Sequence, residues 1–433
     1  MNAFLDNFFK IRENGSSVRT EVLAGLTTFL TMSYIIVVNP TILSEAGMEY
    51  GAVFVATCIA AAIGCLMMGL IANYPIALAP GMGLNAYFTY AVVKGMGVPW
   101  EIALGAVFVS GILFVALSFM KIREAIINAL PMSLKMSISA GIGLFLALIA
   151  LKTAGIVVAN PATYVGLGDV RTPQALMAFL GFFLIVVLDY YRVRGAIIIS
   201  ILAVTFLASV LGMNQFHGVI GSIPSLAPTF MALDFKDLFT AGMVGVIFVF
   251  FFVDLFDSTG TLVGVTHRAG LMVDGKLPRL KKALFADSTA IVVGATLGTS
   301  STTAYIESAS GVAAGGRTGL TAVVVALLFI LGLWFSPLAE SVPSYATAPA
   351  LLYVGVLMIR GLAEIDWHDI TEAAPAFLTA VFMPFSYSIA NGIAMGFISY
   401  AVIKLACGKA REVPYMIWII AALWALKFAL MGA

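Results

Sequence analysis

Apolar runs long enough to cross a membrane are the feature that most constrains this chain. Nearly uncharged runs cover residues 22–38, 52–72, 102–120, 138–151, 175–188, 196–211, 320–335 and 416–430. A helix needs roughly 20 apolar residues to cross about 30 Å of hydrocarbon, and several runs reach that length. Only 10% of the 433 residues are charged, whereas a soluble domain carries about 25%. The chain is therefore predicted to be an all-α polytopic membrane protein.

The distribution of positive charge predicts the orientation of the chain in the membrane. Lys10, Arg12 and Arg19 precede the first apolar run, and threading the spans places most of the 23 Lys and Arg on that same side. By the positive-inside rule, this side is the cytoplasm. We therefore expect a multi-pass protein of the cytoplasmic membrane with its N-terminus inside. The net charge of +1 gives no indication of a nucleic-acid partner.

Residues 1–19 are expected to form a cytoplasmic N-terminal segment without a cleavable signal peptide, because no continuous apolar core precedes a small-residue cleavage site. Phe4, Leu5, Phe8 and Ile11 share one helical face. This pattern suits a short helix lying on the inner membrane surface. A flexible tail is the alternative.

A weak internal repeat divides the chain into two halves. Proline opens comparable apolar segments at Pro131 and Pro343, and each is followed by two apolar segments joined by "RVRG" in one half and "IANG" in the other. The sequence predicts a first repeat over 20–212, a connecting segment over 213–237 and a second repeat over 238–433. If every apolar segment after 375 is counted as a span, residues 416–430 are left over.

Two apolar segments at matching places in the halves are poor continuous helices. Residues 75–93, "PIALAPGMGLNAYFTYAVV", and 299–316, "TSSTTAYIESASGVAAGG", are rich in glycine, proline or small hydroxyl residues. A broken span leaves backbone polar groups unpaired, which is tolerated where they are buried in protein or meet a ligand. Paired interruptions of this kind indicate the binding site of a transporter near the midplane.

Two aspartates stand in the middle of a long apolar segment that is expected to be helical from about residue 238 to 266. Asp254 and Asp257 are three positions apart and face roughly the same way, and Thr261 continues the face of Asp257. A carboxylate at the bilayer centre costs about 2.5–3.5 kcal/mol on insertion scales, so such groups are normally shielded and used. The alternative is that one or both acids only cap or cross-link helices.

The broken segments carry two more polar candidates. Glu307 is an isolated acid within "TTAYIESASG", and Asn85 lies within "PGMGLN" of the other half. Glu307 is either a ligand or a charge favoured at a helix N-terminus. Asn85 offers both a donor and an acceptor, or it caps the short helix that follows the break.

Two acids, an amide and free backbone groups without a fixed positive charge suit a small, planar, neutral solute with several N–H donors. Carboxylates accept such donors strongly, and a buried acid can also take up and release a proton in each cycle. Asp257, Glu307 and Asp254 are the proton-coupling candidates. The three histidines fall in predicted connecting segments, so we expect no metal and no cofactor.

The motifs "DSTGTL" and "TTAYIESASGV", with "EVLAGLTTFLTMSYIIVVNP" and "LAPGMGLNAYF", resemble those of the nucleobase–cation symporter-2 family. The resemblance covers essentially the whole chain and is strongest to the branch of adenine, guanine and hypoxanthine permeases. It implies proton-coupled uptake of purine nucleobases by alternating access, with no enzyme activity.

The resemblance also implies an architecture and a set of site residues. About 14 transmembrane segments would form a 7+7 inverted repeat, with short paired strands in broken spans 3 and 10. A core domain of about 20–120 and 238–336 would move against a gate domain of about 121–212 and 337–433. The substrate-binding residues by this resemblance are Asp257, Glu307, Asn85, Thr261 and the strand residues Tyr305 and Ile306, and Thr261 stands where uracil-type relatives have histidine.

Other functions stay open on the sequence alone. The same architecture carries inorganic anions in other families, although the acids argue against an anionic substrate. An intramembrane aspartyl protease would need two aspartates from separate helices, whereas Asp254 and Asp257 share one segment. A passive channel is a further alternative. The sequence does not decide between a monomer and a homodimer.

Overall fold

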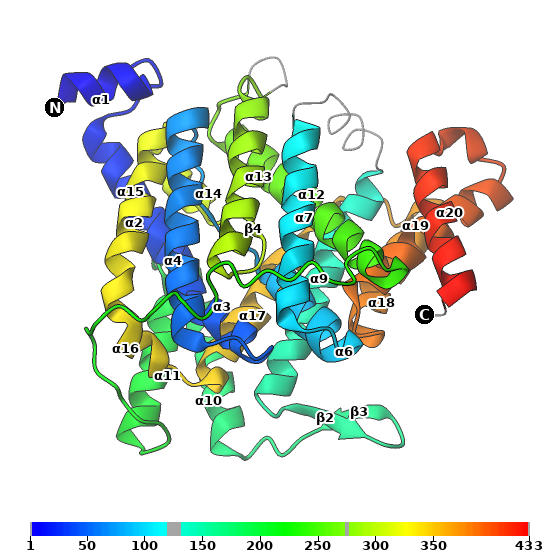
Figure 1. Cartoon of the computed structure of the whole chain (residues 1–433), viewed down its shortest axis with the longest axis horizontal. Helices are drawn as coiled ribbons and strands as arrows, with labels where there is room; N and C mark the ends of the chain where they lie inside the picture. Colours follow the sequence, from blue (N-terminus) through cyan, green and yellow to red (C-terminus); the bar gives the residue numbers. More distant parts are fainter. Residues whose placement is uncertain (1, 119–130, 273–276, 432–433) are drawn as a thin grey trace. The chain divides into compact units, whose positions relative to one another are not determined.

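A computed structural model describes residues 2–118, 131–272 and 277–431 (Figure 1). The end of the predicted apolar run 102–120 and the predicted core–gate boundary near residue 120 lie outside the described residues. The α-helices are α1 (Asn2–Phe9), α2 (Val18–Met32), α3 (Ile35–Ser44), α4 (Tyr50–Met67), α5 (Met82–Ala86), α6 (Lys94–Met96), α7 (Trp100–Ser118), α9 (Met132–Thr153), α10 (Pro173–Tyr190), α11 (Ala196–Val210), α12 (Ala241–Arg268), α13 (Leu280–Leu297), α14 (Ser308–Ala313), α15 (Gly319–Gly332), α16 (Ser336–Glu340), α17 (Ser344–Ile359), α18 (Ile370–Phe385), α19 (Ile389–Ala406) and α20 (Tyr415–Met431). The π-helical and 3₁₀ turns are η1 (Met68–Ala72), η2 (Tyr87–Val93), η3 (Leu333–Phe335), η4 (Arg360–Glu364) and η5 (Ala410–Glu412), and the strands are β1 (Leu78–Pro80), β2 (Val157–Asn160), β3 (Tyr164–Leu167) and β4 (Thr302–Ala304).

The described residues contain nine helices that are long and apolar enough to cross a bilayer, and three shorter apolar helices, α11, α18 and α20. In the 7+7 arrangement the first seven spans run from α2–α3 to α11, and the second seven run from α12 to α19. Spans 3 and 10 are the broken ones, β1–α5–η2 and β4–α14. The predicted fold class, with its short strands in these two spans, is confirmed. The leftover apolar stretch forms α20 as an additional C-terminal helix.

The chain divides into two compact units, residues 1–119 with 177–350, and residues 120–176 with 351–433. The helices α10 and α17 each pass from one unit to the other. The first unit therefore includes most of α10 and all of α11, which the sequence assigned to the gate domain. The division into core and gate domains stays a prediction.

In the first unit, α4 contacts both α15 and α13, and α13 also packs on α7 (Figure 1). Glycines allow the closest of these approaches. A Cβ on Gly25 of α2 would lie 2.6 Å from the side chain of Val324 on α15. Small residues at such contacts are the usual means by which membrane helices pack. The two broken spans lie within this unit, and so does the candidate site.

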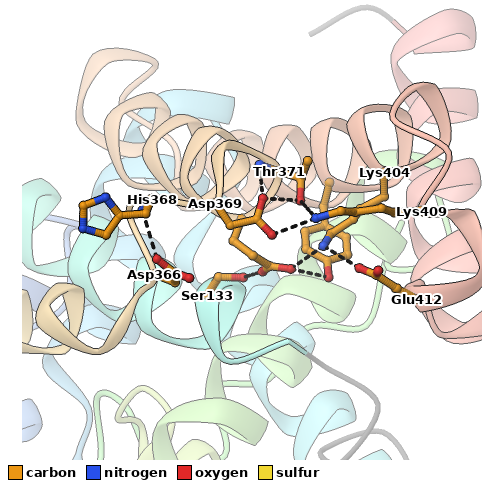
Figure 2. A network of polar contacts seen from close by, with 10 residues as sticks. Ser133, Asp366, His368, Asp369, Thr371, Lys404, Lys409 and Glu412 are labelled. Atoms are coloured by element: carbon orange, nitrogen blue, oxygen red, sulfur yellow. Dashed lines mark hydrogen bonds and ion pairs between the residues drawn. The ribbon is translucent and has the colours of Figure 1, made fainter.

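In the second unit, α18 contacts both α9 and α19. A Cβ on Gly396 of α19 would lie 2.1 Å from Oγ1 of Thr379 on α18. At one end of these helices lies the polar network that Figure 2 shows. The buried ammonium of Lys404 is 2.7 Å from Oε1 of Glu372 and 3.0 Å from Oε2 of Glu412.

The N-terminal segment forms the helix α1, and the chain then returns onto the first unit. Phe9 and Ile11 are buried against Leu320 at the start of α15, while Phe4 and Phe8 are exposed. The placement of α1 on a membrane surface stays a prediction. One expectation about the connecting segments is wrong, because α12 extends to Arg268 and includes His267 in its last turn.

Candidate substrate site

The two broken spans meet as a short antiparallel pair of strands. Leu78 lies opposite Ala304, and Pro80 lies opposite Thr302. The pairing continues at both ends, since the backbone N–H of Tyr305 donates to the Ala77 carbonyl at 3.0 Å and that of Gly81 donates to the Ser301 carbonyl at 2.9 Å. Backbone groups that the helices cannot satisfy are therefore satisfied here by the opposite repeat.

Tyr305 adds a side-chain link to this strand pair. Its phenol is buried and donates to the carbonyl oxygen of Pro80 at 2.5 Å. Ile306 follows with 44% of its surface exposed. Tyr305 and Ile306 therefore connect the end of β4 to Glu307, and the first of these side chains is buried whereas the second is accessible.

Asp257 and Glu307 come close enough for their charges to interact. Asp257 is on α12, which contacts both β4 and α14, and Glu307 is the last residue before α14 begins. Glu307 and Asp287 on α13 both lie within electrostatic range of Asp257, and Glu307 lies within that range of Tyr305. Both Asp257 and Glu307 are partly buried. The structure therefore places Asp257, Glu307 and Tyr305 in one region of the first unit, and their role as a binding site stays a prediction.

Glu307 has a partner that the sequence reasoning missed. The phenol of Tyr34, which joins α2 to α3, donates to Oε1 of Glu307 at 2.6 Å. Tyr34 is buried. A tyrosine in an apolar span is usually explained by packing alone, so the sequence offered no signal for this contact.

Asp254 and Asp257 have different surroundings although they are one helical turn apart. Asp254 is buried, and its Oδ2 accepts a hydrogen bond from Ser301 at 3.2 Å. This contact ties α12 to the residue that precedes β4. It favours the cross-linking interpretation of Asp254.

A second cross-link joins α12 to α13 and β4. The hydroxyl of Ser258 donates to Oδ1 of the buried Asp287 at 2.9 Å, and it lies 2.8 Å from Oγ1 of Thr303. Asp287 is not among the site residues predicted from the sequence. The sequence does contain a feature that marks it, because this acid interrupts the otherwise apolar run that follows Lys282.

Asn85 lies one turn inside α5 and does not cap it, because the N-cap is Gly81. The Asn85 side chain is fully buried, and within the described part of the chain neither its Oδ1 nor its Nδ2 has a hydrogen-bond partner. It therefore makes no hydrogen bond to Asp257 or Glu307. Thr261 is buried on α12, one turn beyond Asp257.

The site offers hydrogen-bond acceptors and an amide rather than a metal centre. In the three described ranges, no group of three or more His, Cys, Asp or Glu residues is arranged to hold a metal ion. Carboxylates at Asp257 and Glu307 accept N–H donors, and Asn85 can both donate and accept. These groups are suited to binding a polar solute and to holding a proton.

Comparisons with known proteins find relatives over nearly the whole chain. The Permease family matches residues 19–395. The chain is 51% identical to the adenine permease AdeP of Escherichia coli K12, over 99% of this chain and 97% of that protein. It is 47% identical to the guanine/hypoxanthine permease PbuG of Bacillus subtilis 168, over 94% of this chain and 96% of that protein.

One solved structure shows the same fold at low sequence similarity. The transmembrane domain of the cyanobacterial bicarbonate transporter BicA matches with a TM-score of 0.66 and 16% identity, over 86% of this chain and 97% of that domain. The structural similarity shows the fold alone, whereas the family match and the identities over nearly the full length show which family the chain belongs to. This chain is a membrane transporter that belongs to the Permease family, in its nucleobase–cation symporter-2 group.

Proposed function

We propose that this protein takes up purine nucleobases, namely hypoxanthine, guanine or adenine, together with protons across the cytoplasmic membrane. The observation that carries the proposal is the placement of Asp257 on α12 and of Glu307 at the start of α14, both beside the β1–β4 strand pair in an otherwise apolar chain. The extended similarity to permeases named for adenine and for guanine/hypoxanthine supports the substrate class.

The chemistry of a purine fits the groups at this site. Each purine presents N–H donors, on ring nitrogens or an exocyclic amine, and ring-nitrogen or carbonyl acceptors on a planar frame. Asp257 and Glu307 would accept the N–H donors, and Asn85, Thr261 and the backbone at Tyr305 and Ile306 would meet the remaining edge. A charge-assisted hydrogen bond contributes about 1.5–3 kcal/mol. Removal of either carboxylate alone would therefore lower the affinity for the purine measurably.

Protons are the coupling ions that fit this arrangement. Two carboxylates that interact at close range do not ionise independently, because the charge on one raises the cost of charging the other. Asp257 or Glu307 would therefore carry the transported proton. Asp254 is the weaker candidate, because Ser301 already holds one of its oxygens.

Alternating access is the expected mode of transport. Its support is the division of the chain into two compact units, each with its own helix packing. In this proposal the unit that holds the acids moves against the other unit and exposes the site to each side in turn. The excess of positive charge on the N-terminal side supports a cytoplasmic N-terminus.

A purine uptake panel tests the proposal. Cells or proteoliposomes that contain the protein should accumulate radiolabelled hypoxanthine, guanine or adenine, and a protonophore should abolish the accumulation. Excess unlabelled purine should compete with the label, whereas sulfate and bicarbonate should not. Accumulation that is insensitive to the protonophore would reject proton coupling, and competition by the anions would favour the anion-transporter alternative.

Variants of the two acids test the site within the same assay. Asp257→Ala and Glu307→Ala should each abolish uptake while the protein still reaches the membrane. Asp189→Asn is a matched control, because Asp189 is an exposed acid near the end of α10. Normal uptake by both alanine variants would overturn the site assignment.

A further inference from the structure

Span 1 is interrupted at the residue that reaches Glu307. The helix α2 ends at Met32 and α3 begins at Ile35. The interruption contains a backbone hydrogen bond of the 3₁₀ type, because the N–H of Ile36 donates to the carbonyl of Ser33, three residues back, at 3.1 Å. Tyr34 lies in this turn, and only 1% of its surface is exposed.

The contact between Tyr34 and Glu307 has the geometry of a charge-assisted hydrogen bond. The separation of 2.6 Å between the phenol oxygen and Oε1 falls in the 2.5–2.7 Å range of O–H donors on carboxylates. The phenol of Tyr34 is the donor and Oε1 of Glu307 is the acceptor. Among the described side chains, Tyr34 is the one that donates to Glu307.

The backbone around this contact leaves little room for adjustment. The helix α14, which follows Glu307, lies against α2, which precedes Tyr34. A Cβ on Gly311 of α14 would come 2.0 Å from Oγ1 of Thr28 and 2.7 Å from the carbonyl of Ala24. The two helices touch through this glycine, so the relative positions of Tyr34 and Glu307 are set by backbone contact.

We propose that Tyr34 is a positioning residue for Glu307, whose carboxylate is proposed to bind the substrate. It holds Oε1 and thereby leaves Oε2 oriented to accept an N–H of the substrate. This inference rests on the proposed role of Glu307 in binding a purine. The terminal torsion of a glutamate side chain is broad and roughly two-fold, and the hydrogen bond from Tyr34 selects one orientation from that range.

Tyr34→Phe tests this role because it removes one oxygen atom and keeps the buried ring. We expect the KM for purine uptake to rise about tenfold, in keeping with the loss of a hydrogen bond to a charged group, with the maximal rate and the abundance in the membrane unchanged within about twofold. Tyr50→Phe is the matched control, since the Tyr50 phenol donates to the backbone carbonyl of Ala339 at 2.9 Å. Its KM should match that of the unsubstituted protein.

Infrared difference spectroscopy of the purified protein reports on Glu307 without transport. The carboxylate band that disappears in Glu307→Gln should shift in Tyr34→Phe and stay in place in Tyr50→Phe. A band that does not move in Tyr34→Phe, or an unchanged KM, would overturn the inference. A fall in abundance and maximal rate with an unchanged KM would also overturn it, because it would show a packing role only.

The same measurements separate this inference from the proposed function. If Glu307→Gln transports purines with unaltered KM, the proposed role of Glu307 fails and the Tyr34 inference fails with it. If Glu307→Gln is impaired while Tyr34→Phe matches the unsubstituted protein, the proposed function stands and only the positioning role is rejected.

Discussion

Gly69 and Gly319 face each other so closely that neither position can accept a side chain. A Cβ on Gly319 would lie 2.0 Å from the carbonyl oxygen of Gly69, and a Cβ on Gly69 would lie 2.6 Å from that of Gly319. This contact joins the end of span 2 to the start of α15. The second unit repeats the device, since a Cβ on Gly355 would lie 2.7 Å from the carbonyl oxygen of Gly143.

Gly319→Ala should destabilise the protein because the backbones must separate to admit the methyl group. Overpacking of this kind costs about 1–3 kcal/mol, and we expect a lower midpoint of thermal unfolding in detergent. Gly242→Ala is the control, since the nearest heavy atom to a Cβ there is Cε of Met96 at 3.8 Å. Equal midpoints for the two variants would show that the contact between Gly69 and Gly319 is not as tight as described.

Tyr305→Phe should weaken the link between the two broken spans. The phenol donates to the carbonyl of Pro80, and without it this buried acceptor loses its side-chain partner. We expect a loss of about 1–3 kcal/mol in the free energy of unfolding, together with a higher KM for purine. Tyr190→Phe is the control, because 80% of the Tyr190 surface is exposed. A Tyr305→Phe protein with the stability of the Tyr190→Phe control would contradict the prediction.

Glu372→Ala should destabilise the second unit more than Glu412→Ala does. Both acids pair with the ammonium of Lys404, whose side chain is only 2% exposed, but the side chain of Glu372 is 23% exposed and that of Glu412 is 55% exposed. Removing a partner of a buried charge costs up to about 3–5 kcal/mol when the charge is left unpaired, whereas an exposed partner contributes at most about 1 kcal/mol; because Glu412 stays, the cost of losing Glu372 should fall between these limits.

The two variants therefore form a matched pair around one cation. Thermal unfolding in detergent should place the midpoint of Glu372→Ala well below that of Glu412→Ala. Glu372 also accepts hydrogen bonds from Ser133 on α9 and Tyr400 on α19, so its loss affects three helices at once. Similar midpoints would show that Lys404 finds sufficient solvation without Glu372.

The main features of the fold were predictable, and two of the proposed site residues were noticeable in the sequence, because charged and helix-breaking residues are rare in membrane spans. Glycine and proline break spans 3 and 10 where an ordinary span would be a continuous helix, so their strands could be anticipated. Asp257 and Glu307 stand out because a carboxylate in hydrocarbon is costly. The structure then brings both acids to the strand pair, although about 50 residues separate them in sequence.

The residues that escaped prediction are those whose role depends on tertiary contacts. Tyr34 looks like any aromatic residue of an apolar span, and only the approach of α14 to α2 gives its phenol an acceptor. The sequence left the role of Asp254 open between substrate binding and a cross-link, because the cross-link depends on Ser301, which lies far along the chain. For Asn85 the sequence left substrate binding and a helix cap open, and the structure excludes the cap because Asn85 lies one turn inside α5.

Equilibrium binding of radiolabelled hypoxanthine, guanine and adenine to the purified protein tests the central claim most directly. With the purine that binds best, Asp257→Asn and Glu307→Gln should each raise Kd by about 10- to 150-fold, since each removes a charge-assisted hydrogen bond. Asp189→Asn should leave Kd unchanged. Unaltered Kd values in both site variants would contradict the claim that these two carboxylates bind the substrate.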